Sequence, residues 1–414
     1  MKFSIGKTFL LGFGFFGVSV IWSVYNAYVP IFLADRFLLG AGFIGVFMTL
    51  DNIASLFIQP AVGAYSDRLR TRIGKRMPFI LVGAPLAAIS FTLLPISNSL
   101  FLFFLSATLL LLSMAIWRTP VIALMPDITP SKYRSPANGI INLMGGLGAI
   151  VAFFVGADLY EKNPEYPFLL GAALVLVAAI LVFIFIREPK VTETTQVEKP
   201  DLIKSVKKLF ADKEKSPLFM LGAIFFWFVA YAGIEAFFTL YGINYLQYTA
   251  ADGARLLGQM AILLVIFAIP AGYIGAAIGR KRTIMIGVAL MTACVVSMFI
   301  LPPATLKIVL ATVPVLKNIP VVGAILMVTG IAWALININS LPMVVDMTDA
   351  TRIGTFTGLY YLFSTLSAIT GPILYGFIIQ LTGGSYNLVM IISPLFLVMA
   401  FLCMSFVKRG EAQS

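Results

Sequence analysis

Twelve long apolar stretches, separated by short polar gaps, constrain this chain more than any other feature of its sequence. A helix that crosses the hydrocarbon core of a bilayer needs about 20 apolar residues, and each stretch approaches or exceeds that length. Charged residues make up only 11% of the chain, whereas they make up about 25% of a typical soluble domain. The sequence therefore predicts an all-α polytopic membrane protein and excludes a soluble enzyme and a disordered chain.

The apolar stretches predict twelve transmembrane helices with approximate spans 8–33, 41–64, 78–97, 100–124, 136–158, 168–187, 217–240, 254–277, 283–301, 319–341, 354–381 and 386–407. The stretch 302–318 is also apolar, but three prolines interrupt it. We therefore predict an outside loop there, with a position on the membrane interface as one option.

Lysine and arginine residues are concentrated in alternate gaps between the predicted helices. If the N-terminus is cytoplasmic, 23 of the 29 basic residues lie on the cytoplasmic side, five lie outside and Arg118 lies within a span. Cytoplasmic loops of membrane proteins carry such an excess, which predicts a multi-pass protein of the cell membrane with both termini in the cytoplasm. The same distribution explains the net charge of +11 without a nucleic-acid partner.

The longest polar stretch, 188–216, divides the chain into two predicted six-helix bundles, 1–187 and 217–414. Its Asp201–Phe210 portion carries apolar residues at helical spacing opposite lysines. That pattern is typical of a helix on the cytoplasmic membrane surface, although a solvated tether explains it equally well. An internal repeat supports the division, because the segment from Asp127 aligns with the segment from Asp346 at a constant offset of 219.

Three strings carry a resemblance to a known family. They are QPAVGAYSDRLRTRIGKRMPFI (Gln59–Ile80), RTPVIALMPDITP (from Arg118) and INSLPMVVD (from Ile338). The first resembles the loop signature of the major facilitator superfamily. In spacing, all three are similar to the sucrose–proton symporters and the glycoside–pentoside–hexuronide:cation symporters. The resemblance covers essentially the full chain and implies two parallel-related six-helix bundles with a substrate site between them. It also implies proton-coupled uptake of a sugar, with a di- or oligosaccharide or a glycoside favoured.

Three ionisable residues lie well inside predicted spans: Asp51, Arg118 and Glu235. Each costs about 2.5–3.5 kcal/mol at a helix centre, so we expect them to face the protein interior. Since the chain contains no histidine, a carboxylate must carry any coupled proton. We assign this role to Asp51, with Arg118 as its ionic partner and Glu235 as the second candidate; a static ion pair is the structural alternative. The resemblance also bears on the coupling ion: sodium-coupled melibiose-type relatives carry more than one acid on the second helix, so the single acid here favours H⁺ over Na⁺.

Amide, aromatic and charged side chains inside the spans form the predicted substrate site. Amides and carboxylates bind sugar hydroxyls, and aromatic faces pack against the sugar ring; helix packing is the alternative for each aromatic residue. The predicted substrate-binding residues are Trp22, Tyr25, Asn26, Asn52, Arg118, Asn142, Glu235, Asn337, Tyr360 and Tyr361.

Charged residues at the ends of the predicted helices form a candidate cytoplasmic gate. Asp67 can accept charge-assisted hydrogen bonds from helix N-termini and basic side chains, and we expect it to bind near Asp346 and Arg352 of the other half. The alternative is that the basic loop only sets topology. The predicted gate residues are Asp67, Arg68, Arg72, Arg76, Asp127, Asp346 and Arg352.

Other functional classes fit the sequence less well. No histidine, paired cysteine ligands or nucleophile–base constellation supports an enzyme, so we predict neither a metal site nor a cofactor. The favoured function is a monomeric sugar transporter in the lipid bilayer, working by alternating access. The alternatives are an exporter of an amphipathic drug or lipid and a membrane receptor that does not transport.

Overall fold

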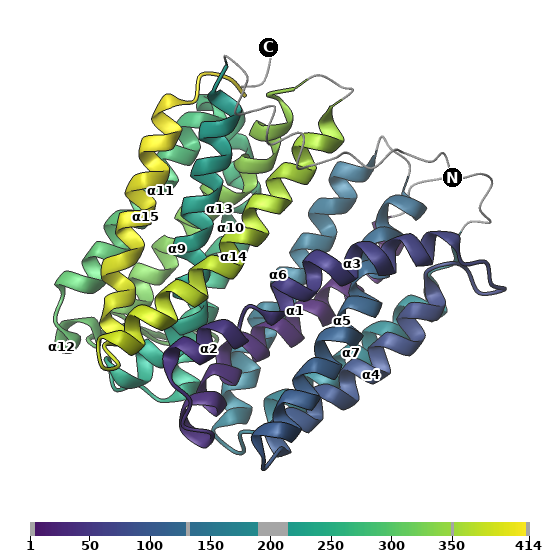
Figure 1. Ribbon diagram of the computed structural model, residues 1–414, viewed down its shortest axis with the longest axis horizontal. Coiled ribbons are helices and arrows are strands. Elements are labelled where there is room, and N and C mark those ends of the chain that lie inside the picture. The colour runs from purple at the N-terminus through teal and green to yellow at the C-terminus, as the bar shows by residue number, and fades with distance from the viewer. Residues whose placement is uncertain (1–4, 130–132, 189–213, 349–351, 411–414) are drawn as a thin grey trace. The chain divides into compact units, whose positions relative to one another are not determined.

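The computed structural model describes residues 5–129, 133–188, 214–348 and 352–410 (Figure 1). In this part of the chain, twelve helical spans are long and apolar enough to cross a membrane. The predicted all-helical membrane architecture is therefore confirmed. The surface helix predicted at Asp201–Phe210 lies outside the described residues.

The chain divides into two compact units. The first consists of Met1–Leu39, Leu50–Thr195 and Ala250–Gly258, and the second of Gly40–Thr49, Gln196–Thr249 and Gln259–Ser414. Two short segments thus leave the half to which the sequence assigns them. Gly40–Thr49 packs with the second unit, and Ala250–Gly258 packs with the first.

The helices of the first unit are α1 (Ile5–Ile31, continued by a π-helical turn at Phe32–Arg36), α3 (Leu50–Arg68), α4 (Met77–Ile96), α5 (Leu100–Ile128), α6 (Arg134–Tyr160) and α7 (Tyr166–Phe185). Helix α1 packs against α6 and α7, whereas α5 packs against α3 and α4. Glycine makes the closest of these approaches possible. A Cβ atom on Gly148 of α6 would lie 2.4 Å from the carbonyl oxygen of Phe16 on α1, so no larger residue fits there.

The helices of the second unit are α2 (Ala41–Phe47), α9 (Ser216–Asn244), α10 (Ala250–Ile278, whose first residues belong to the first unit), α11 (Arg280–Ile300), α13 (Val321–Val345), α14 (Ile353–Leu381) and α15 (Val389–Phe406, preceded by the 3₁₀ turn Tyr386–Leu388). Helix α9 packs against α14 and α15, α11 packs against α13 and α15, and α2 packs on α14. The cores of both units consist of apolar side chains.

The stretch 302–318 differs from the loop that we expected. It contains the short helix α12 (Pro303–Leu306) and the antiparallel hairpin of β1 (Val309–Val313) and β2 (Lys317–Pro320). The prolines do prevent a long helix, as expected. However, Pro314 lies in the turn, and the β-branched residues beside it favour extended strands.

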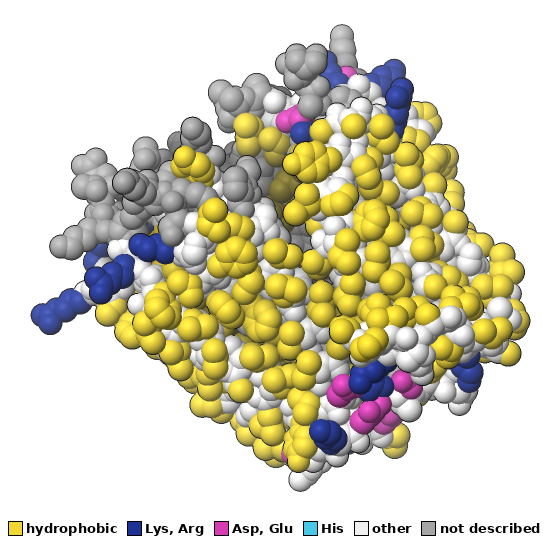
Figure 2. Space-filling model, turned by 180° about the vertical axis from the view of Figure 1, so that it is seen from behind, with side chains coloured by type: hydrophobic (Ala, Val, Ile, Leu, Met, Phe, Trp, Pro, Cys, Tyr) yellow, Lys and Arg dark blue, Asp and Glu magenta, His cyan; other side chains and the backbone are white. Residues whose placement is uncertain are grey.

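Hydrophobic side chains cover most of the visible face of the helices, and charged side chains are gathered near helix ends (Figure 2). This distribution matches helices that meet lipid along their length and water at their ends. It agrees with the predicted membrane location of the chain.

Candidate substrate and coupling site

A pocket inside the first unit brings together the intramembrane charges of that unit. Its lining comes from α1, α3 and α5. The lining residues are Trp22, Asp51, Ala54, Ser55, Gln59, Leu111, Met114, Ala115 and Arg118. The pocket therefore contains three residues that the sequence predicts for the site, namely Trp22, Asp51 and Arg118.

Helical spacing explains how α3 places its polar side chains in the pocket. Asp51, Ser55 and Gln59 follow one another at intervals of four residues, which puts them on one face of the helix. Gln59 donates from Nε2 to Oγ of Ser55 over 2.9 Å, so the two side chains hold each other in position. Sequence reasoning missed Ser55 and Gln59, although their spacing from Asp51 carries the signal.

Asp51 occupies the first turn of α3, directly after the break that separates α2 from α3. The positive end of the helix dipole lies there and favours a carboxylate. In addition, Asn52 donates from Nδ2 to Oδ1 of Asp51 over 2.9 Å. Local backbone geometry therefore offsets part of the cost of a carboxylate inside a membrane span.

Arg118 reaches the same pocket from α5, but it does not touch Asp51. Among the described residues, no direct ion pair joins the two side chains, although each lies within the electrostatic reach of the other. This differs from the contact pair that the sequence suggests. The two opposite charges line one pocket without meeting in a contact ion pair.

Buried polar atoms without partners belong to Trp22, which lines the pocket, and to two residues of α1 and α5, the helices that contribute to its lining. Nε1 of Trp22, Oη of Tyr25 and Oγ1 of Thr119 are buried and have no hydrogen-bond partner among the described residues. Trp22 and Tyr25 meet edge to face, with ring centroids 5.6 Å apart. Because buried polar groups in native proteins are almost always hydrogen-bonded, a bound solute or water has donors and acceptors to meet here.

The second unit contains an aromatic cluster beside the third intramembrane charge. Tyr231 of α9 stacks on Trp333 of α13, with ring centroids 4.0 Å apart and an interplanar angle of 5°. Phe228 places an edge against Trp333 at 5.3 Å and against Tyr360 at 6.3 Å. Glu235 follows Tyr231 by one helical turn and lies within its electrostatic reach. We did not predict Phe228, Tyr231 or Trp333; the spacing of Tyr231 from Glu235 was the available signal.

The remaining predicted substrate contacts lie in varied environments. Asn26 and Asn337 are half-buried. Asn142 is exposed and donates to the backbone oxygen of Asn138. Its repeat equivalent Tyr361 is 56% exposed, whereas Tyr360 is buried and shares a hydrogen bond with Ser340. None of these side chains lines the pocket of the first unit.

An ionic cluster joins the α3–α4 loop to the end of α5. The guanidinium of Arg76 donates from Nε to Oδ2 of Asp127 over 3.0 Å and also bonds to Ser66 and Asp67. Lys75 adds an ion pair of 3.2 Å to Asp127. Arg76 is only 4% exposed, so the cluster holds a nearly buried cation.

Asp67 also has a partner within its own unit that we did not predict. It binds Arg76 within its own unit, because the loop after α3 is short and returns Arg76 to the end of that helix. Arg68 and Arg72 are exposed. Asp67, Arg76 and Asp127 are therefore the predicted gate residues that the first unit brings together.

The second unit repeats this arrangement. Arg280, at the start of α11, pairs with Asp346, which follows α13. Gly74 and Gly279 precede the two basic segments with φ angles of 116° and 94°, a backbone region that favours glycine. Arg352 lies elsewhere, with its guanidinium 5.4 Å from the centroid of the Phe356 ring.

A second ionic network lies at the end of α6. Arg255, from the α10 segment that belongs to the first unit, pairs with Asp158 at 2.7 Å, Glu161 at 2.6 Å and Asp252 at 3.3 Å. This network was not predicted from the sequence. The available signal was an arginine among the few basic residues expected outside, together with two acids spaced by three residues, Asp158 near the end of α6 and Glu161 directly after it.

The described residues contain no group of three or more His, Cys, Asp or Glu side chains that could hold a metal ion. The pocket of the first unit contains one carboxylate, Asp51, one guanidinium, Arg118, and the hydrogen-bonding side chains of Ser55 and Gln59. Such an arrangement can bind a polar solute and exchange a proton.

Comparison with known proteins gives consistent results. The sequence model of the Major Facilitator Superfamily matches residues 11–333. Multidrug resistance protein 1 of Bacillus subtilis (strain 168) is 26% identical over 251 residues, which are 60% of each chain. Quinolone resistance protein NorA of Staphylococcus aureus is 24% identical over 240 residues, 57% of this chain and 58% of that protein. The matched part of the chain thus spans about 60% of the length of these curated relatives.

Solved structures of transporters have the same fold. The nucleoside transporter NupG superposes with a TM-score of 0.72 at 15% identity, covering 98% of this chain and all of its own. A bacterial homologue of the human lysosomal transporter Spinster, inward-facing and occupied, gives a TM-score of 0.74 at 13% identity, covering 97% and 96%. The family match covers most of the chain, and the twelve-helix fold agrees with it. The chain belongs to the major facilitator superfamily of secondary transporters.

Proposed function

We propose that this secondary transporter carries a di- or oligosaccharide or a glycoside into the cell together with protons. The observation that carries the proposal is the pocket of the first unit, where Asp51, Gln59 and Arg118 accompany the indole of Trp22. Carboxylate, amide and guanidinium groups match the hydroxyls of a sugar, and an indole matches the apolar face of its ring. The unpartnered Trp22 Nε1 and Tyr25 Oη add hydrogen-bonding capacity beside it.

In this proposal Asp51 carries the proton. When Asp51 is ionised, its charge and that of Arg118 balance across the pocket. A proton on Asp51 turns one oxygen into a donor and removes that balance, so Arg118 becomes free to bind the solute. Protonation and substrate binding then favour each other by the same coupling free energy, and a proton gradient can drive uptake.

The proposal is tested with purified protein reconstituted into liposomes. A thermal-shift screen of sucrose, maltose, raffinose and methyl glucosides should find a sugar that raises the melting temperature, because a ligand stabilises the state that it binds. A pH gradient, acidic outside, should then drive accumulation of that sugar. If no sugar binds or accumulates while the protein remains folded, the sugar proposal is wrong.

Replacing Trp22 with alanine should weaken sugar binding about tenfold, since an aromatic contact contributes roughly 1–1.5 kcal/mol. Isothermal titration of the reconstituted variant measures the effect. Trp22→Phe is the matched control, because it keeps an aromatic face and should retain most of the affinity. Equal affinity for Trp22→Ala and the unmodified protein would place the sugar away from this pocket.

Export of an amphipathic organic cation is the second candidate function. It is favoured by the cluster of Phe228, Tyr231 and Trp333 beside Glu235, since aromatic faces and a carboxylate attract cations. The curated relatives named for drug resistance agree with it. Export of ethidium from loaded liposomes, driven by a pH gradient and unaffected by sugars, would favour this function over sugar uptake. A receptor would bind a solute without moving it.

The network around Arg255 bears on how the transporter changes conformation. Since Ala250–Gly258 of α10 belongs to the first unit and the rest to the second, movement between the units must bend α10 or break contacts of this segment. We expect the ion pairs of Arg255 to hold the segment in place. We further propose that the protein is a monomer and that both of its termini lie in the cytoplasm. In this orientation, the network around Arg255 lies on the outer side of the membrane.

Replacing Arg255 with glutamine should release the start of α10. The side chains of the acids that bind Arg255 are 39–51% exposed, so each ion pair contributes less than about 1 kcal/mol. Loss of all three pairs should shift the equilibrium between the held and the released start of α10 about tenfold. A cysteine at the buried Ala254, in a background without Cys294 and Cys403, should therefore react faster with maleimide. Lys162→Gln, which removes the exposed cation directly after Glu161, is the control. Unchanged labelling would show that the network does not hold the segment.

A further inference from the structure

The hairpin of β1 and β2 exposes an unusual number of apolar side chains. All residues of 308–315 are exposed, and Thr312 is the only polar side chain among them. Ile308 is 55% exposed, Leu310 is 60% exposed and Val315 is 64% exposed. Contiguous exposed apolar surface of this kind marks an interaction site.

The exposure is built into the fold, because the hairpin is held firmly along β2. Gln259 of α10, which is 1% exposed, donates from Nε2 to the backbone oxygens of Leu316 at 3.1 Å and Asn318 at 2.8 Å. The backbone nitrogen of Val321 donates to the oxygen of Ile308 over 2.9 Å. These bonds fix one edge of the hairpin against the unit and leave β1 as the free edge.

Water is a poor environment for this hairpin. A free edge strand of Val309, Leu310, Ala311, Thr312 and Val313 has neither the charges nor the prolines that usually protect an edge from aggregation. Its side chains are exposed on both faces. Something apolar must therefore cover them in the working protein.

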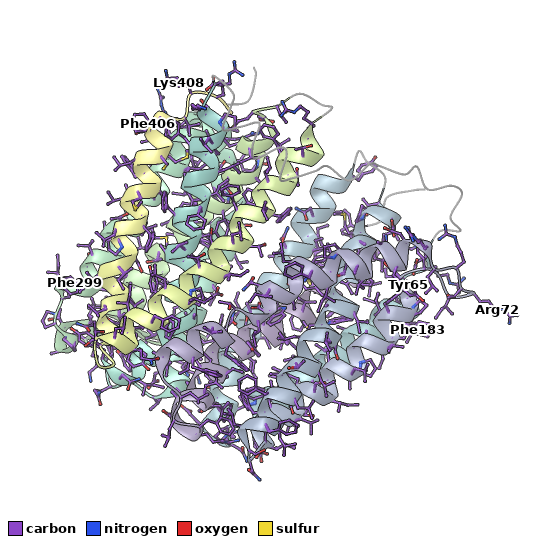
Figure 3. All side chains as sticks on the ribbon, viewed as in Figure 1. Tyr65, Arg72, Phe183, Phe299, Phe406 and Lys408 are labelled. Atoms are coloured by element: carbon purple, nitrogen blue, oxygen red, sulfur yellow. The ribbon has the colours of Figure 1, made fainter. Side chains whose placement is uncertain are left out.

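The hairpin continues the lipid-facing surface of the membrane spans. It follows the end of α11, where Phe299 is 43% and Ile300 is 68% exposed. Phe299 lies at the opposite end of the second unit from Phe406 and Lys408 (Figure 3). By the orientation predicted from the basic loops, this is the outer membrane surface.

The charges near the hairpin fit the headgroup region. Lys307 precedes the hairpin and Lys317 is the first residue of β2; both are exposed, and the stretch 301–320 contains no acid. Lysine beside apolar residues is typical of segments that lie at the interface, with the ammonium group among the phosphates.

We propose that the hairpin Val309–Pro320 is an interfacial anchor that places its apolar side chains at the acyl-chain boundary of the outer leaflet. The unpaired backbone groups of β1 limit its depth, because they must stay hydrated and cannot enter the hydrocarbon core. The hairpin therefore lies in the plane of the membrane surface rather than across it. The proposal is independent of the transported substrate.

Spin labels on the full-length protein in liposomes test this. Single cysteines at Leu310 and Val315, in a background without Cys294 and Cys403, carry the nitroxide; a label at the exposed Lys162 of the same side is the matched control. We expect oxygen to relax the hairpin labels several-fold more, relative to a water-soluble nickel complex, than it relaxes the Lys162 label. Equal accessibility ratios at the three sites would overturn the proposal.

Two further measurements separate the lipid from other occupants. Replacing phosphatidylcholine with phosphatidylglycerol should deepen the hairpin labels, and Lys307→Gln with Lys317→Gln should remove that difference, because the lysines attract anionic headgroups. Spin–spin broadening at low protein-to-lipid ratio would instead show that a second copy of the chain covers the hairpin, and would overturn the lipid assignment.

Discussion

Asp51→Asn is expected to abolish uphill sugar accumulation while leaving sugar exchange across the membrane largely intact. Asparagine has the shape of protonated aspartate and cannot release a proton. In our proposal the loaded carrier can still reorient and exchange labelled for unlabelled sugar, but a proton gradient can no longer drive it. The variant should therefore pass counterflow assays and fail accumulation assays in the same liposomes.

The pH dependence of sugar affinity provides a second test of the role of Asp51. Affinity of the unmodified protein should fall as pH rises through the titration of Asp51, because the proton and the sugar bind together. Affinity of Asp51→Asn should not change with pH. Asp35→Asn, an exposed acid of the same unit, is the matched control and should behave as the unmodified protein. Full accumulation by Asp51→Asn would remove Asp51 from the mechanism and leave Glu235 as the carrier.

Arg76→Ala is expected to destabilise the first unit strongly. The substitution leaves Asp127 with Lys75 alone and removes a nearly buried cation that also binds Ser66 and Asp67. Breaking a fully buried pair costs about 3–5 kcal/mol. Because the Asp67 side chain is 49% exposed, we expect a smaller loss of about 2–3 kcal/mol in unfolding free energy.

Arg72→Ala provides a sharp control, because it removes one positive charge from the same loop at an exposed position. Its effect should stay within about 0.5 kcal/mol. Melting temperatures in detergent, with a cytoplasmic-side labelling assay for topology, measure both variants. If the two variants lose equal stability, the loop acts only through its total charge and the ionic cluster has no structural role.

A capping interaction joins the start of α4 to the segment after α7. The carboxylate of Glu188, which follows α7, accepts hydrogen bonds from the backbone nitrogens of Lys75, Arg76 and Met77 at 2.8–3.1 Å. It thereby satisfies donors at the start of α4 that have no partner within the helix. In the second unit, the carboxylate of Glu214 accepts from the backbone nitrogen of Ser216, and this hydrogen bond lowers the pKa of Glu214.

The fold was largely predictable because a few strict physical requirements determine where a chain can span a membrane. Each span needs a minimum apolar length, and every buried charge is costly, so the apolar runs locate the helices directly. The hairpin at Val309–Pro320 was not predictable in this way, because apolar residues interrupted by prolines are compatible with several structures. Gly40–Thr49 and Ala250–Gly258 each belong to the unit other than the one expected from sequence order. Tertiary packing decides this assignment, and local sequence patterns do not predict it.

The candidate site was predictable in part for the same energetic reason. Asp51 and Arg118 were expected to face inward because lipid is costly for charges, and they do line one pocket with Trp22. Asn142 and Tyr361 were chosen by residue type and repeat position, and neither lines that pocket. Residue type alone does not indicate which face of an apolar helix a side chain occupies. The pairing of Asp67 with Arg76 was not predicted either, because the length of the loop decides it.

Sugar-dependent proton movement is the most direct test of proton-coupled sugar uptake through Asp51. Liposomes containing the protein and a trapped pH-sensitive dye receive sucrose, maltose or a methyl glucoside outside, without an imposed gradient. We expect the transported sugar to acidify the interior, and we expect Asp51→Asn to abolish the acidification while sugar exchange continues. Sugar entry without acidification, or acidification that persists in Asp51→Asn, would contradict proton-coupled uptake through Asp51.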